Sequence, residues 1–147
     1  KKGTRTMKRK RYTQPEKPHE LDTLKMLTTP EQYEVITDAM LGEEDDHFIE
    51  IIDRIYATWE QMPKTYATAD QGREAIAHLH FFVGSCDWWI VEKDADTDHA
   101  GQVQTFGIAD LGMGYRELGY ISIPELLANG AELDLHYRPK TIGEILA

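Results

Sequence analysis

Two histidines, His78 and His80, are the first residues in this sequence that could hold a metal ion. In a strand over residues 76–83 both side chains would project from the same face, because side chains alternate along a strand. Imidazole nitrogen is a common zinc ligand, and Asp87 or His136 is a conceivable third ligand. The alternative is that both histidines lie on the wetter face of a sheet, or that one is hydrogen-bonded in the core. No spacing in the sequence specifies a third ligand, so we expect neither a metal nor another cofactor.

A glycine-punctuated segment, Leu111-Gly112-Met113-Gly114-Tyr115, lies between two expected strands and has charged residues at both ends. In a binding site, the glycines would let a ligand or a partner approach the backbone. In a hairpin connection, they would supply positive φ, with the carboxylates accepting amide hydrogens and the arginine pairing with them. The segment leads back into a strand, whereas a dinucleotide-binding motif opens a helix. The candidate binding residues are Asp110, Tyr115, Arg116 and Glu117.

Two adjacent tryptophans, Trp88 and Trp89, are further candidates for binding. Neighbouring residues of a strand face opposite sides of the sheet, so one ring faces the core and the other faces away from it. If helices cover the second face, both rings belong to the core. If they do not, one ring is exposed and marks a contact surface, because tryptophan is enriched at binding hot spots.

The single cysteine, Cys86, lies in an expected turn beside Ser85 and Asp87. A cysteine–histidine pair is conceivable, but no adjacent cation or helix N-terminus favours the thiolate, so we do not expect catalysis by this residue. One cysteine permits no intrachain disulfide, which suits a reducing compartment, and we expect a cytoplasmic protein. We expect no membrane association, since no apolar run approaches the roughly 18 residues of a membrane span.

The first elements expected along the chain form a helical hairpin over residues 29–62. The segment Thr29-Pro30-Glu31-Gln32 has the cap residue, the early proline and the reciprocal glutamine of a helix start, and Gly42 ends this helix. Glu43–Asp46 then place negative charge on the first turn of a second helix, where the helix dipole favours it. Apolar residues at three- and four-residue spacing continue to the helix end at Pro63.

The second half of the chain changes to the period of strands. We expect strands over residues 76–83, 86–93, 103–110, 119–123 and 131–137. A short helix is expected at residues 125–128 and a final helical turn at 141–144. The predicted fold class is α+β, with the N-terminal helical hairpin packed on a four- to five-stranded, mostly antiparallel sheet that has a short inserted helix. Residues 21–147 are expected to form one domain.

The net charge of −10 is divided unevenly along the chain. Residues 1–20 are expected to form a basic extended arm, and the first eleven residues hold seven cations and no anion. The rest of the chain holds 9 basic against 26 acidic side chains, a balance of −17. Because so acidic a body repels polyphosphate, nucleic-acid binding is expected only through Lys8–Arg11 of the arm. The alternative for the arm is a solvated tail.

A long ordered pattern in the second half carries a family resemblance. Phe81-Phe82-Val83 and Trp88-Trp89-Ile90-Val91-Glu92 precede FGIADLGMGYRELGYISIPELLANGAELDLHYRP at residues 106–139. This pattern resembles the family known as domain of unknown function 2958, over roughly residues 76–139. The resemblance implies a small accessory protein of plasmids and other mobile elements, encoded near conjugation and antirestriction genes. It implies no catalytic residue and no ligand-binding residue.

Three functions follow from these patterns as hypotheses. The leading one is a non-enzymatic accessory protein of a mobile genetic element, which binds an unidentified protein partner through the glycine-rich turn, an exposed tryptophan or the acidic helical face. The second is a DNA mimic that occupies the basic groove of a nucleic-acid enzyme, with acidic residues 43–46 and 94–98. The third is a metal-dependent hydrolase that uses His78 and His80 with Asp87 or Asp110.

Overall fold

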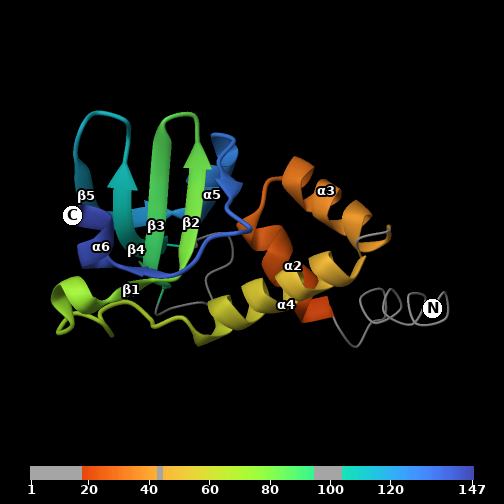
Figure 1. Ribbon diagram of the computed structural model, residues 1–147, viewed down its shortest axis with the longest axis horizontal. Helices are drawn as coiled ribbons and strands as arrows, with labels where there is room; N and C mark the ends of the chain where they lie inside the picture. The colour runs from red at the N-terminus through yellow and green to blue at the C-terminus, as the bar shows by residue number, and fades with distance from the viewer. Residues whose placement is uncertain (1–17, 43–44, 95–103) are drawn as a thin grey trace. The chain divides into compact units, whose positions relative to one another are not determined.

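A computed structural model describes residues 18–42, 45–94 and 104–147 of the chain (Figure 1). The described chain divides into two compact units, one ending at Glu60 and the other beginning at Gln61. Most of the predicted basic arm, the acidic pair Glu43–Glu44 and residues 95–103 lie outside the described residues.

The first unit is helical. It contains α2 (Pro18–Leu27), α3 (Pro30–Met40) and α4 (Asp45–Gln61), of which only the last residue belongs to the second unit. Thr29 caps α3 as predicted, because its side-chain oxygen accepts a hydrogen bond from the Gln32 amide at 3.0 Å. Helix α4 ends just before Pro63, which was also predicted.

The prediction of an extended chain up to residue 20 was wrong, because α2 begins at Pro18. Proline has no backbone N–H, but the N–H at the first helical position has no partner within the helix. Proline is therefore favoured at the start of a helix, although it breaks the interior of one. Leu24 and Leu27, three residues apart on this helix, are fully buried. The packing of the helices on the sheet stays a prediction, since it concerns the two units together.

The second unit is built on a five-stranded antiparallel sheet with the strand order β5-β4-β3-β2-β6. The strands are β2 (Leu79–Val83), β3 (Cys86–Glu92), β4 (Gln104–Asp110), β5 (Arg116–Ser122) and β6 (Glu132–Leu133). A separate pair joins β1 (Ile76–Ala77) to β7 (Lys140–Thr141). The short helices are η1 (Gly72–Glu74), α5 (Ile123–Ala128) and α6 (Ile142–Leu146). The chain therefore has the α+β class that the sequence predicts, with a short helix inserted after β5.

Three strand predictions need correction. The expected strand 76–83 is broken at His78, whose amide bonds to the Ile90 carbonyl at 2.7 Å, and its two halves belong to different sheets. The expected strand 131–137 contains only the two residues of β6. Its remainder turns, because an Asp134 carboxylate oxygen accepts the His136 amide at 3.0 Å and so competes with strand pairing. Strand β5 begins at Arg116, three residues earlier than expected.

One face of the sheet is covered by β1 and α6, through a cluster of buried residues. The register places His80 opposite Trp89, Trp89 opposite Ile108, and Ile108 opposite Leu118, so these residues form one row across four strands. The cluster consists of Ala75, Ala77, Trp89, Val91, Ile108, Ile142 and Ile145. Thr141 caps α6 with a complete capping box to Glu144, which confirms the predicted final turn of helix.

Candidate functional site

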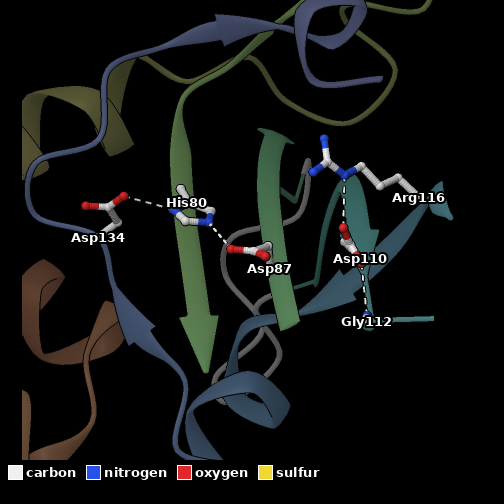
Figure 2. Close-up of polar contacts among 6 residues, drawn as sticks. All are labelled: His80, Asp87, Asp110, Gly112, Arg116 and Asp134. Carbon is white, nitrogen blue, oxygen red and sulfur yellow. Dashed lines mark hydrogen bonds and ion pairs between the residues drawn. The ribbon is translucent and has the colours of Figure 1, made fainter. Parts of the chain in front are cut away.

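The candidate site is the hairpin of β4 and β5, and we call its connecting residues Leu111–Tyr115 the hairpin tip. Asp110 and Arg116 are cross-strand partners at the base of the tip. One carboxylate oxygen of Asp110 accepts the Gly112 amide at 2.9 Å, and the other accepts a hydrogen bond from Arg116 Nε at 2.9 Å (Figure 2). Gly112 and Gly114 have φ of 78° and 92°, so the glycines supply the positive φ that a hairpin connection requires.

The charge of Asp110 is fixed by these contacts. The hydrogen bond from the Gly112 amide and the one from Arg116 both lower the pKa of the Asp110 carboxyl. Both bonds favour the ionised form, because a carboxylate accepts hydrogen bonds more strongly than a carboxylic acid does. Asp110 therefore remains a carboxylate at neutral pH and links the tip to Arg116.

Arg116 joins the hairpin to the core of the second unit. Its guanidinium carbon lies 4.9 Å from the centre of the Trp89 ring, and its Nη1 donates to the Ile145 carbonyl of α6. Trp89 is buried, with 8% of its surface exposed, whereas Trp88 is half-buried. Of the two tryptophans proposed for binding, Trp89 thus belongs to the core and supports the hairpin from below.

The hairpin tip exposes large apolar side chains. Leu111 is 53% exposed, Met113 67% and Tyr115 56%. They occupy alternate positions with glycines between them, so three of five tip residues present apolar surface to solvent. Glu117 lies just beyond the tip and is also exposed. Tyr115 and Glu117 were predicted as binding residues. Leu111 and Met113 were not, although apolar residues in a glycine-rich turn were a visible signal in the sequence.

An open depression of about 530 Å³ lies beside the tip. Ser85, Asp110, Tyr115, Arg116 and Ile145 contribute to its lining. Its wall is thus formed by the ion pair at the base of the tip, together with α6 and the turn between β2 and β3. A partner that covers the apolar tip would have this depression available for a polar side chain.

His80 of β2 lies between two carboxylates, Asp87 of β3 and Asp134, which follows β6. Its Nδ1 is 2.9 Å from Asp134 Oδ2, and its Nε2 is 2.8 Å from Asp87 Oδ1 (Figure 2). Its ring also stacks on Trp89, with 5.1 Å between ring centres. Both nitrogens are therefore engaged, and Asp87, considered above as a metal ligand, is instead a hydrogen-bond partner of His80.

His78, the second candidate metal ligand, is half-buried at the break between β1 and β2. Burial lowers the pKa of its imidazole, because desolvation disfavours the charged ring. Among residues 18–42, 45–94 and 104–147, no group of three histidine, cysteine or acidic side chains is arranged to hold a metal ion. The metal-dependent hydrolase stays a prediction. The DNA mimic also stays a prediction, because its acidic segments lie mostly outside the described residues.

The fold and the site define a small α+β protein with a hairpin that is braced at its base by Asp110 and Arg116 and exposes an apolar tip. The sequence model of the family described as "Protein of unknown function (DUF2958)" matches residues 50–138 of the 147, so the chain belongs to this family. The predicted resemblance is confirmed, and the match begins earlier than expected, within α4. No curated protein and no solved structure matches the chain. No helix in the described part of the chain is long and apolar enough to span a membrane.

Proposed function

We propose that this chain is a non-enzymatic accessory protein that acts by binding another protein, and that the hairpin tip is its contact surface. The observation that supports this most is the exposure of Leu111, Met113 and Tyr115, each more than half exposed. Isolated exposed apolar side chains are common on protein surfaces, but adjoining ones typically mark interaction sites. Tyrosine, methionine and arginine are also enriched at protein interfaces.

The contacts that brace the base of the tip favour the same function. Association costs free energy when it immobilises loops and side chains, and a loop held in one conformation avoids much of that cost. Here Asp110 holds the Gly112 amide, while Arg116 holds Asp110 and contacts Trp89 and α6. The apolar tip is therefore held by contacts made within the free protein.

The features of the tip suggest the chemistry of the partner. Three apolar side chains fit an apolar groove, which would remove them from water on binding. The exposed carboxylate of Glu117 at the rim would suit a basic group at the edge of that groove. We propose further that the protein serves a mobile genetic element and is cytoplasmic, for which the support is the pattern of residues 106–139 and the single cysteine.

Site-specific photocrosslinking tests this proposal. A photoreactive phenylalanine is placed at Met113 and, as a matched control, at Val35 of α3, which is apolar and 65% exposed. Both proteins are irradiated in cells that naturally express the chain. We expect one protein to be crosslinked from position 113 and not from position 35. Equal crosslinking from both positions, or none from position 113, would count against the proposal.

A further inference from the structure

The second unit contains a cavity of about 440 Å³ away from the hairpin tip. Its apolar lining comes from the segment before β1, from β4 and β5, and from α6: Ala69, Ala75, Phe106, Leu118, Ile142 and Leu146. Cavities that bind small molecules have volumes of roughly 300–1,000 Å³ and are mostly apolar, with a few polar groups that orient the ligand. This cavity has both properties.

Two tyrosines form part of its rim. The hydroxyl groups of Tyr66 and Tyr120 are 2.8 Å apart and hydrogen-bonded, which joins the segment before β1 to β5. Tyr66 has a φ of 74°, in the left-handed region that is sterically unfavourable for a residue with a side chain. Such strain persists where the surrounding structure enforces it, and it is concentrated at functional sites.

The side chain that enforces this conformation is Glu92. Its Oε1 accepts the Tyr66 amide at 2.9 Å and its Oε2 accepts the Thr68 amide at 2.9 Å. Glu92 is 3% exposed, so a buried carboxylate fixes the turn on which Tyr66 stands. Both of its oxygens are directed to this turn, which leaves the tyrosine hydroxyls and one cation to face a ligand.

That cation is Arg73 of η1, which lines the cavity and is exposed. Its Cβ and Nε lie 3.4 and 3.6 Å from the point where a Cβ on Gly143 would stand, so the side chain packs against α6. Within residues 18–42, 45–94 and 104–147, no hydrogen bond or ion pair to its guanidinium is present. An arginine beside an apolar cavity suits a ligand that joins a hydrocarbon body to an anionic group.

We propose that this cavity is a binding site for a small amphipathic monocarboxylate. The hydrocarbon or aryl body occupies the apolar part, lined by Phe106, Leu118 and Leu146. The carboxylate accepts hydrogen bonds from Arg73 at the rim, and the one hydroxyl of the Tyr66–Tyr120 pair that does not donate to the other is a further donor. The site is distinct from the hairpin tip, because Leu111, Met113 and Tyr115 do not line this cavity.

Titration of the full chain with sodium octanoate tests the proposal, with octan-1-ol as the neutral probe of the same chain length. Binding is measured by calorimetry, and the methyl resonances of Leu118 and Leu146 locate it. We expect octanoate to shift these resonances, and the variant Arg73→Gln to bind octanoate about tenfold more weakly. Octan-1-ol should bind the wild type and Arg73→Gln equally. Arg138→Gln, which changes an exposed arginine away from the cavity, should bind octanoate like the wild type.

Two further variants separate loss of the site from loss of the fold. Ala69→Trp fills the cavity from an exposed position and should abolish binding of both probes. Tyr66→Gly removes the rim hydroxyl and relieves the strained φ, so it should weaken octanoate binding without lowering the thermal midpoint. Octanoate that shifts neither methyl group, or that binds Arg73→Gln as tightly as the wild type, would overturn the proposal.

Discussion

Arg116 on β5 and Trp89 on β3, two strands separated by β4, are joined by a cation–π contact of 4.9 Å. The tryptophan is a buried member of the core cluster, and the arginine stands at the base of the hairpin tip. Since the same guanidinium also bonds to Asp110 and to the Ile145 carbonyl, the tip is connected to the core through one side chain.

Replacing Arg116 should therefore loosen the tip and destabilise the second unit. We expect Arg116→Gln to lower the free energy of unfolding by about 1–2 kcal/mol, because it removes a charged hydrogen bond and the ring contact. Arg116→Lys should recover little of this, since an ammonium group cannot make the same planar contacts. Urea unfolding monitored by tryptophan fluorescence measures both. A lysine variant as stable as the wild type would show that charge alone matters here.

His80 should contribute to stability and not to ligand binding. The variant His80→Leu leaves the carboxylates of Asp87 and Asp134 without their imidazole partner, and we expect a loss of about 1–3 kcal/mol. The near-ultraviolet circular dichroism of Trp89 should change as well, because the two rings stack. His19→Leu, at an exposed position of α2, is the control and should alter neither measurement.

The lowered pKa of His78 predicts that the stability of the folded chain depends on pH. Burial lowers the pKa of His78 in the folded chain below the ordinary value of 6.5, so the unfolded chain takes up a proton that the folded chain does not. The stabilising contribution of the neutral ring is present above pH 6.5 and is lost as the pH falls towards the pKa of the folded chain. We expect the stability difference between the wild type and His78→Gln to shrink or reverse over this interval. A difference independent of pH from 7.5 to about 5 would contradict the cause given.

Two glycines paired across β4 and β5, Gly107 and Gly119, provide a matched test of the packing. A Cβ on Gly107 would lie 1.8 Å from the Trp89 carbonyl oxygen, whereas one on Gly119 would meet no heavy atom within 4 Å. We expect Gly107→Ala to destabilise by about 3 kcal/mol. Gly119→Ala should be neutral or stabilise by about 0.5 kcal/mol, since alanine loses less backbone entropy on folding. Chemical denaturation of the two variants decides, and equal stabilities would refute this arrangement of strands.

The sequence predicted those features whose causes lie within a few residues of each other. Thr29 and Thr141 cap the helices that follow them, and Asp110 contacts Gly112 and Arg116 across a short hairpin. These contacts depend on local spacing, which a sequence displays directly. The α+β class and the succession of helices and strands along the chain were predictable for the same reason.

The features that the sequence did not reveal depend on residues far apart in the chain. His80 contacts Asp134, 54 residues away, and Glu92 holds the turn of Tyr66, 26 residues away. Neither contact can be predicted from a local sequence pattern, and a tyrosine with left-handed backbone angles goes against the usual backbone preference. The break at His78 was not predicted, because a strand-like apolar run continues through it. The two halves of that run nevertheless pair with different strands.

The affinity of the protein crosslinked from position 113 gives the most direct test of the proposed contact surface. Its dissociation constant is measured for the wild type, for Met113→Lys and for Val35→Lys, the last being an equally exposed control on α3. A charge introduced into a desolvated apolar contact should weaken binding by tenfold or more, at about 1.4 kcal/mol for each factor of ten, while Val35→Lys leaves it unchanged. Unchanged affinity for Met113→Lys, in a variant that keeps the stability of the wild type, would contradict the assignment of the hairpin tip as the binding surface.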